Sequence, residues 1–237
     1  MTVLSRGKRV VIIGDSHMEA LGPRLRTRLP RAAGVIVQHV EPRRGWSARR
    51  YVGSGIVRGI TRGADVVIFE LGGNDASANV SPARHARDIA TLISQAAPAQ
   101  VIWVGPGVTL RPELEAARAP LRATQARVVP EQGGAWVDAQ PMTRTADLAP
   151  DGVHFRAAGY TRWADQLAPA LASVSAGAGG IAPQPGGAQP GKGGAAPSIP
   201  GGSKPGGGTD SRWWVAPAIL AGTATLALAI VLWSRRR

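Results

Sequence analysis

The sequence predicts an α/β protein, a three-layer sandwich in which helices cover both faces of a mostly parallel, five-stranded sheet. Three observations lead to this fold class. Short apolar runs alternate with longer helix-like stretches over residues 1–175. The runs are continuously apolar and rich in Val and Ile, as in strands that are buried on both faces. Gly and Pro, 31 and 19 of the 237 residues, are partly concentrated after this region, which favours one domain of this size followed by an appendage.

Five apolar runs are expected to form the strands. The first, at residues 10–13, is bounded by Lys8-Arg9 and by Gly14, which is typical of a short buried strand. The other four lie at residues 35–37, 66–69, 101–104 and 135–137. Helices are expected over residues 17–29, 54–62, 82–97, 113–128 and 157–172. Ser81-Pro82 is a typical start signal for the third of these helices.

The C-terminal region is expected to hold a linker and a membrane anchor. Residues 176–212 are rich in Gly and Pro and cannot form a core, so we expect a disordered linker. Residues 213–234 carry no charge, and their number is close to the roughly 20 residues with which a helix crosses a bilayer. Tryptophans lie near both ends of this span, and three arginines at 235–237 form a basic tail. The alternative is a buried helix of the globular domain.

The side of the membrane on which the domain lies stays open. The three terminal arginines favour a cytoplasmic C-terminus, which places the domain outside. No signal-peptide pattern precedes the first strand, which favours a cytoplasmic domain. A third alternative is that the tail is a processed sorting signal.

The net charge of +13, from 28 Lys and Arg against 15 Asp and Glu, allows two interpretations. Such a charge is compatible with a nucleic acid or an anionic membrane surface as partner. The alternative is a solvated surface that is rich in Arg, and on this interpretation no nucleic acid partner is expected. The same alternatives apply to Arg43, Arg44, Arg49 and Arg50 beside Gly45, which either attract an anionic substrate or are solvated.

Several kinds of chemistry are excluded or unsupported. The chain has no cysteine, which excludes disulfides, thiol nucleophiles and thiolate metal sites. Its four histidines show no metal-ligand spacing, so neither a metal nor another cofactor is expected.

The segment Gly14-Asp15-Ser16-His17 directly follows the first strand. A serine at this position lies at the sheet edge where sites of α/β proteins form. The N-terminus of the following helix favours negative charge there. Ser16 is therefore a candidate nucleophile, and the alternative is that Ser16 is only the helix N-cap.

The segment Asp151-Gly152-Val153-His154 precedes the last expected helix. In a tight turn, an aspartate three residues before a histidine can orient the imidazole and stabilise its protonated form. Gly152 permits such a turn. The alternative is an ordinary Asp-Gly turn with an incidental histidine.

The segment Gly72-Gly73-Asn74-Asp75 follows the strand at 66–69. The amide of Asn74 is a neutral donor suited to a developing oxyanion, and the backbone N–H of Gly45 is a further candidate donor. The alternative is that both segments are plain turns.

Together, these segments resemble the SGNH hydrolase superfamily, also called GDSL esterases or lipases, over residues 9 to about 165. The resemblance implies a flavodoxin-like SGNH fold and a serine esterase that forms an acyl-enzyme. It implies a catalytic triad of Ser16, Asp151 and His154. It also implies an oxyanion hole formed by the Ser16 N–H, the Gly45 N–H and the Asn74 side chain.

The chain departs from the family pattern at three positions. His17 stands where Leu is commoner, Ala48 where a second glycine often follows, and Phe155 where proline is frequent. His17 and Phe155, together with Trp46, are the candidate substrate-binding residues. No lid is visible in the sequence, so we expect a shallow, open site.

The expected function is a membrane-anchored serine esterase that acts on an O-acetyl group of a cell-wall glycan or on a lipid ester. One alternative is an O-acyltransferase that uses the same triad. Another is a catalytically silent binding or structural module with the same fold, tethered to a membrane. The sequence indicates no oligomeric state.

Overall fold

Five strands form one parallel sheet in the structure, a computed structural model that describes residues 2–175. The strands are β1 (Arg9–Gly14), β2 (Ile36–Pro42), β3 (Val66–Glu70), β4 (Gln100–Val104) and β5 (Ala135–Val137). Their spatial order is β2-β1-β3-β4-β5, and every neighbouring pair is parallel. This order is that of flavodoxin-like sheets, and it confirms the predicted α/β class with a five-stranded sheet.

Side chains of each strand alternate between two cores because successive residues of a strand point to opposite faces. Val10 and Ile12 of β1 pack in the core that includes residues of helices α1 (Ser16–Ala33) and α7 (Ala157–Ser173). Val11 and Ile13 pack in the other core, against helices α5 and α6. Burial on both faces explains why the strand sequence is apolar without interruption.

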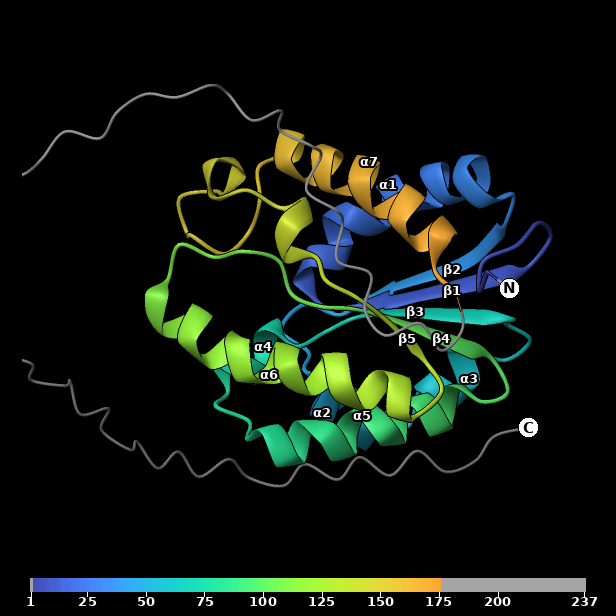
Figure 1. Ribbon diagram of the computed structural model, residues 1–237, viewed down its shortest axis with the longest axis horizontal. Helices are drawn as coiled ribbons and strands as arrows, with labels where there is room; N and C mark the ends of the chain where they lie inside the picture. Colours follow the sequence, from blue (N-terminus) through green and yellow to red (C-terminus); the bar gives the residue numbers. More distant parts are fainter. Residues whose placement is uncertain (1, 176–237) are drawn as a thin grey trace, which may run out of the picture. The chain divides into compact units, whose positions relative to one another are not determined.

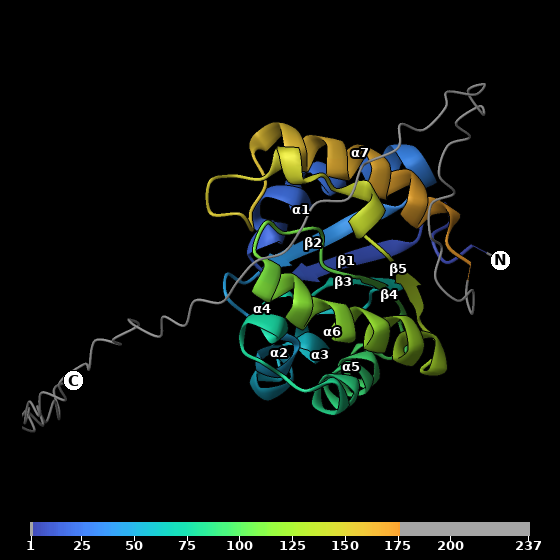
Figure 2. The ribbon, with the colours of Figure 1, turned by 60° about the vertical axis from the view of Figure 1, so that its left-hand side comes forward.

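Helices cover both faces of the sheet (Figures 1 and 2). Helices α1 (Ser16–Ala33) and α7 (Ala157–Ser173) lie on one face. The opposite face carries α2 (Ala48–Ser54), α3 (Val57–Ile60), α4 (Gly73–Ser77), α5 (Pro82–Ala96) and α6 (Pro112–Glu131). Two 3-10 turns, Gln140–Met142 and Thr145–Asp147, lead from β5 to α7.

The single helix expected over residues 54–62 is wrong. Two short helices, α2 and α3, occupy this part of the chain, and α2 begins before the predicted start. Ser47 accepts a hydrogen bond from Arg50 N and starts α2. Gly55, with φ +67°, adopts the left-handed conformation that ends it. Helix α4 begins at Gly73, where the sequence predicts only a turn.

The predicted C-terminal parts lie outside the described residues. These are the linker at 176–212, the transmembrane helix at 213–234 and the basic tail at 235–237. Within residues 2–175, no helix has both the length and the apolar character that a membrane crossing requires.

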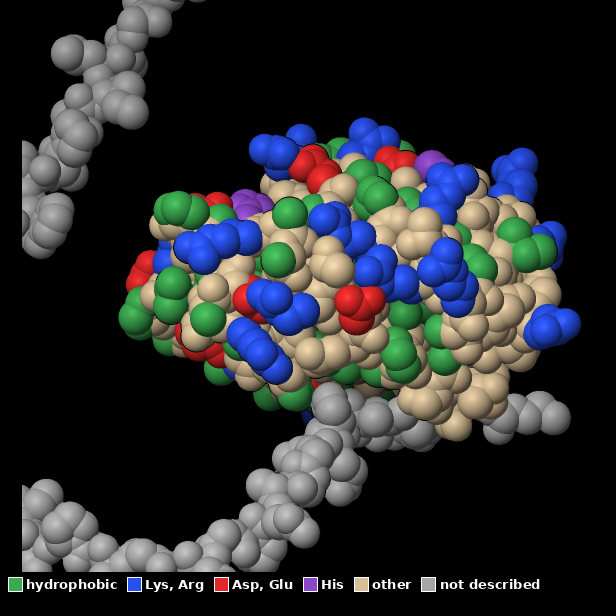
Figure 3. Space-filling view, turned by 90° about the horizontal axis from the view of Figure 1, so that it is seen from above, with side chains coloured by type: hydrophobic (Ala, Val, Ile, Leu, Met, Phe, Trp, Pro, Cys, Tyr) green, Lys and Arg blue, Asp and Glu red, His purple; other side chains and the backbone are tan. Residues whose placement is uncertain are grey.

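Positive charge is dispersed over the α1–α7 face rather than gathered in one patch (Figure 3). Some of these arginines have acidic partners, as in the pair of Arg28 with Asp165 and the pair of Arg162 with Asp147. A dispersed arrangement favours a solvated surface over a groove for a polyanion.

Candidate active site

Ser16 is the first residue of α1, and only Asp15 separates it from the end of β1. Asp15 caps this helix, since Asp15 Oδ1 accepts a hydrogen bond from His17 N at 2.9 Å. The interpretation of Ser16 as the N-cap is therefore wrong, and its hydroxyl is free to take another partner. That partner is His154, whose Nε2 lies 2.8 Å from Ser16 Oγ.

His154 lies between Ser16 and Asp151, with Nδ1 2.7 Å from Asp151 Oδ2. An ionised carboxylate only accepts hydrogen bonds, so His154 Nδ1 carries the hydrogen. Nε2 is then left to accept the proton of Ser16 Oγ. The structure thus brings the three residues of the predicted triad into one line of hydrogen bonds.

The turn that carries Asp151 and His154 is held by its own hydrogen bonds. Asp151 Oδ1 accepts from Val153 N and from His154 N, both at 2.9 Å, and Gly152 has φ +70°. Burial alone would raise the pKa of Asp151, but the bonds from Val153 N and His154 lower it to about 2. Asp151 is therefore ionised at neutral pH, as an orienting carboxylate must be.

Asn74 lies in the first turn of α4, and its side-chain amide has two acceptors. Nδ2 donates to Asp15 Oδ2 at 3.0 Å and to the carbonyl oxygen of Trp46 at 3.1 Å. The reverse orientation of the amide would set Oδ1 against two oxygen acceptors, so these partners fix its orientation. Because both hydrogens of Nδ2 are engaged, an oxyanion must share one of them.

The two other predicted oxyanion donors are backbone N–H groups at the same edge of the sheet. Ser16 N is at the first position of α1, where an N–H has no acceptor within the helix. Gly45 has φ +71° in the loop between β2 and α2. This loop is joined to the end of β1 by the bond from Arg43 N to Gly14 O, at 2.9 Å. The participation of these donors in catalysis stays a prediction.

Asp75 is fully buried below the site and holds the start of α2. Its Oδ2 accepts from Ala48 N at 3.0 Å, and its Oδ1 faces His85 Nδ1 at 3.5 Å. Gln125 Nε2 lies 3.0 Å from His85 Nε2. An amide nitrogen only donates, so His85 Nε2 accepts this bond and Nδ1 carries the hydrogen that faces Asp75.

Three further charged side chains are buried below the site, namely Asp15, Glu70 and Arg118, which are 2%, 1% and 1% exposed. Burial raises the pKa of Asp15 to about 6 and that of Glu70 well above its usual value. No sequence motif points to a role for Glu70 or Arg118. Glu70 is detectable as a carboxylate at the end of an apolar strand, whereas nothing in the local sequence distinguishes Arg118 from Arg127, an exposed arginine of the same helix.

The three candidate substrate-binding residues lie in different surroundings. His17 and Phe155 are only 3% and 5% exposed and pack with Tyr160 and Trp163. His17 Nδ1 lies 3.0 Å from the Tyr160 hydroxyl, and burial lowers the pKa of His17 to about 3. Trp46 is half-buried. The burial of His17 and Phe155 favours an indirect effect on the site.

Trp46 lies at the rim of the site, where two arginines contact its ring. The guanidinium carbons of Arg43 and Arg50 lie 5.2 and 4.9 Å from the ring centroid. Arg44 pairs with Glu19, and Arg43 with Glu41. Part of the positive charge around Gly45 is thus compensated by carboxylates.

The triad is open to solvent, since the side chains of His154 and Asp151 are 41% and 44% exposed. A hollow of about 280 Å³ lies near the turn of the triad, although no triad residue lines it. Arg111 lies between the two, because Arg111 lines the hollow and its Nε donates to Asp151 O at 2.9 Å. Within residues 2–175, no three His, Asp or Glu side chains are grouped so as to hold a metal ion.

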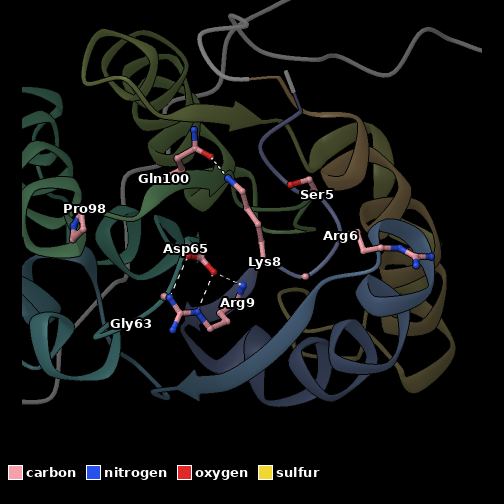
Figure 4. A pocket seen from close by; sticks show the side chains of 10 residues that line it. Ser5, Arg6, Lys8, Arg9, Gly63, Asp65, Pro98 and Gln100 are labelled. Carbon is pink, nitrogen blue, oxygen red and sulfur yellow. Dashed lines mark hydrogen bonds and ion pairs between the residues drawn. The ribbon is translucent and has the colours of Figure 1, made fainter.

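A larger hollow, of about 730 Å³, lies at the opposite edge of the sheet (Figure 4). Lys8 Nζ donates to Gln100 Oε1 at 2.9 Å there, and Arg9 pairs with Asp65. The residues that line it include no histidine and thus no base for a serine nucleophile. Its size therefore does not mark it as the active site.

A model of the GDSL-like Lipase/Acylhydrolase family matches residues 12–162 of the chain. This span includes Ser16, Asp151 and His154. No curated protein matches the chain's sequence.

Solved structures share the fold at low sequence identity. Among them is a catalytic mutant of Axe2, an acetylxylan esterase from Geobacillus stearothermophilus, with a TM-score of 0.57 and 16% identity over 72% of this chain and 96% of that one. A lipase/acylhydrolase from Enterococcus faecalis has a TM-score of 0.58 and 19% identity over 70% and 95%. LAE5, an alpha/beta hydrolase enzyme from the metagenome of Lake Arreo, Spain, has a TM-score of 0.52 and 20% identity over 73% and 100%.

Proposed function

The chain belongs to the GDSL-like lipase/acylhydrolase family and is a hydrolase of ester bonds, and on this premise we propose that it removes short acyl groups through Ser16, His154 and Asp151. The observation that carries the proposal is the pair of hydrogen bonds at His154. Its Nε2 lies 2.8 Å from Ser16 Oγ, and its Nδ1 lies 2.7 Å from Asp151 Oδ2.

In the acylation step, His154 Nε2 takes the proton of Ser16 while Ser16 Oγ attacks the ester carbonyl. The imidazolium that forms is stabilised by the ionised Asp151. The negative charge on the former carbonyl oxygen is stabilised by the N–H groups of Ser16 and Gly45 and by Asn74. When the tetrahedral intermediate collapses, the alcohol leaves with the proton of His154, and the acyl group stays on Ser16.

In the deacylation step, water takes the place of the alcohol. His154 Nε2 accepts a proton from the water, whose oxygen attacks the acyl carbonyl, and the same donors stabilise the second oxyanion. Collapse returns the proton to Ser16 Oγ and releases the acid. The exposure of His154 supports this step, because water reaches the base directly.

Two features of the site support short acyl groups, acetyl above all. The hollow beside the triad, about 280 Å³, is smaller than the roughly 300–1,000 Å³ of pockets that enclose drug-sized ligands. Ala76, Leu114 and Ala117 supply apolar contacts for a small acyl group there, and Arg111 and Glu113 make the rest of the lining polar. The Axe2 relative is an acetylxylan esterase, which supports an acetylated glycan as the substrate.

We further propose that residues 213–234 anchor the enzyme in a membrane through the linker at 176–212. The support comes from the uncharged span, its flanking tryptophans and the terminal arginines. Acetylated cell-wall glycans or lipid esters would then be the nearest substrates. Protease digestion of intact cells tests the side of the membrane: loss of the domain places it outside, and protection places it inside.

The catalytic proposal is tested by reacting the purified full chain with a fluorophosphonate probe and by measuring hydrolysis of p-nitrophenyl acetate. We expect one labelled site, Ser16, identified by mass spectrometry of the labelled peptide. Ser16→Ala should lose both labelling and hydrolysis. Ser94→Ala, which alters an exposed serine on α5, is the matched control and should retain both. Hydrolysis that survives Ser16→Ala would contradict the proposal.

The acyl preference is tested with p-nitrophenyl esters of two to twelve carbons and with acetylated xylooligosaccharides. We expect kcat/KM to be highest for the acetyl ester and to fall as the chain lengthens beyond the hollow. A maximum at eight or more carbons would contradict the proposed preference and leave the triad unaffected.

A further inference from the structure

We infer that Arg118, on α6, is a positioning residue for this reaction. It links the loop that supports the turn of Asp151 and His154 to the surroundings of the buried Asp15 carboxylate. Asp15 in turn accepts a hydrogen bond from the Asn74 amide. This inference rests on the proposed ester hydrolysis and deepens it. Arg118 is 1% exposed and touches no solvent, so it does not contact substrate.

The first half of the link leads from Arg118 to the turn of the triad. Arg118 Nη1 donates to Gly107 O at 3.1 Å, in the loop between β4 and α6. Two residues further on, Thr109 Oγ1 donates to Gly152 O at 2.7 Å, and Leu110 N donates to the same oxygen at 2.8 Å. Arg118 thus holds a loop that in turn holds Gly152, one of the two residues between Asp151 and His154.

The second half leads from Arg118 to the oxyanion side. A Cβ placed on Gly73 would stand 3.3 Å from Arg118 Nη2 and 3.5 Å from Asp15 Oδ2. The guanidinium and the carboxylate therefore lie against the same face of Gly73. Asp15 Oδ2 is also the acceptor of Asn74 Nδ2, and Asp15 Oδ1 is the acceptor of His17 N. One carboxylate thus supports both the amide and the first turn of α1.

The charges in this cluster balance when Glu70 is neutral. Burial and the neighbouring Asp15 raise the pKa of Glu70 well above its usual value, so Glu70 keeps its proton at neutral pH. Asp15 then remains as the ionised carboxylate, and the nearby charge of Arg118 lowers its pKa although the two side chains form no direct ion pair. The titratable and charged groups that act on Asp15 are Glu70 of β3, Arg118 of α6, Asp75 of α4 and His154 of the triad turn, and the backbone N–H of His17 acts on it through a hydrogen bond.

Removal of the guanidinium would affect both halves of the link. Arg118 lowers the pKa of Asp15, so without it that pKa rises above about 6 and Asp15 becomes protonated closer to neutral pH. A neutral Asp15 holds the Asn74 amide less firmly, because hydrogen bonds to charged acceptors are the stronger ones. The loop at Gly107 loses its donor at the same time. The chemical step becomes slower while the substrate contacts remain, so kcat should fall and KM should stay nearly constant.

The test compares Arg118→Met, Arg118→Lys and Arg127→Met in the full chain. Arg127 lies on the same helix but is exposed and pairs with Glu131, so its replacement is the matched control. We measure kcat and KM for p-nitrophenyl acetate from pH 5 to 9, and scale them by the fraction of protein that reacts with the fluorophosphonate probe.

We expect Arg118→Met to lower kcat by about 10- to 100-fold, as small misplacements of catalytic groups do, with KM within about twofold. The acid limb of its kcat profile should move to higher pH. Arg118→Lys keeps the charge and should recover much of the lost kcat and return the acid limb toward its wild-type position. Arg127→Met should match the wild type.

If Arg118→Met yields no folded protein, Gly73→Ala tests the same link from the other side. Its Cβ would stand 3.3 Å from Arg118 Nη2, a tight contact, and 3.5 Å from Asp15 Oδ2, an ordinary one, so Arg118 must shift and kcat should fall with the same shift of the acid limb. A Gly73→Ala variant with the wild-type kcat profile would contradict the inference.

Several outcomes would overturn the inference while the esterase proposal stands. These are a wild-type pH profile for Arg118→Met, a loss explained entirely by the unfolded fraction, or an Arg118→Lys variant as impaired as Arg118→Met. A wild-type chain that neither reacts with the probe nor hydrolyses esters overturns the proposed function, and the inference with it.

Discussion

The carboxyl ends and the amino ends of the parallel strands form two opposite edges of the sheet, here called the carboxyl edge and the amino edge. The two edges differ in how far their charged side chains are buried. At the carboxyl edge, Asp15, Glu70 and Arg118 are almost completely buried below the triad. At the amino edge, Arg9 and Asp65 form an ion pair whose side chains are 48% and 37% exposed, beside the larger hollow. The same strands supply both edges, so the difference comes from the loops and helix ends that flank the strands on each side. Buried charge and oriented donors identify the active edge, whereas the volume of a hollow does not.

The difference has a physical cause in the direction of the chain. In a parallel sheet, helix N-termini meet the carboxyl ends of the strands, and their N–H groups favour anions there. Ser16 opens α1 directly after β1, and Asn74 lies in the first turn of α4 soon after β3. At the amino edge, hydrogen bonds from the Arg9 side chain and from Arg9 N lower the pKa of Asp65 to about 2, but solvent surrounds the pair.

The largest expected effect at the carboxyl edge is that of His154→Ala. We expect kcat/KM for p-nitrophenyl acetate to fall by at least about 10⁴-fold, because the general base is removed. His154 is half-exposed, so the melting temperature should change little. His39→Ala, which removes a similarly exposed histidine on β2, is the control and should stay within about twofold. A comparable loss in both variants would contradict a specific role for His154.

The next largest effect is expected for the side-chain amide of Asn74, the proposed oxyanion donor. Asn74→Ala should lower kcat by about 10²-fold, at the low end of the range for one oxyanion donor, since the Asn74 hydrogens are shared with Asp15 and Trp46. KM should remain nearly constant, because this donor acts mainly on the transition state. A loss of less than tenfold would leave the backbone N–H groups as the main donors.

A smaller effect, on the pH dependence of the free energy of unfolding, distinguishes the buried carboxyl group of Glu70 from the exposed one of Asp65. The folded-state pKa of Glu70 is raised, so the folded protein holds this proton more tightly than the unfolded chain. The wild type therefore loses stability as pH rises above the unfolded pKa, by up to about 1.4 kcal/mol per pH unit. Glu70→Gln does not titrate, so its free energy of unfolding relative to wild type should improve between pH 5 and pH 8.

Asp65→Asn is the comparison for this measurement, made by urea unfolding at both pH values. The folded-state pKa of Asp65 is lowered, so its stabilising effect is lost only as pH falls below the unfolded value toward about 2. Asp65 is ionised in both states from pH 5 to pH 8, and its difference from wild type should stay constant. Equal pH trends for the two variants would contradict the assignment of Glu70 as neutral.

The smallest effect is expected at the amino edge. Arg9→Ala should leave kcat within about twofold and lower the melting temperature only slightly. The decrease should disappear in 1 M salt, because exposed ion pairs contribute little and are screened. A clear loss of kcat would show that the amino edge is coupled to the active site and would remove the contrast between the two edges.

The outline of the fold could be predicted from local sequence, and the triad from the resemblance of short segments to a known family. Apolar runs identify buried strands wherever they occur, and all five predicted strands overlap β1 to β5. Ser16, Asn74 and His154 could be proposed because they lie in short segments next to recognisable strands and helices. The boundary between α2 and α3 could not be predicted, because it depends on the left-handed conformation of Gly55 and on the cap at Ser47.

The sequence by itself determined the α/β class, the strands and the residue types of the triad, since periodicity and short motifs act over a few residues. The tertiary structure decided which groups meet. It made Asp15 rather than Ser16 the helix cap, engaged both hydrogens of Asn74, and turned Arg118 inward from a helix that also carries the exposed Arg127. These outcomes depend on burial and on contacts between distant segments, and an arginine in a helix has the same local sequence signal whether it faces water or a buried carboxylate.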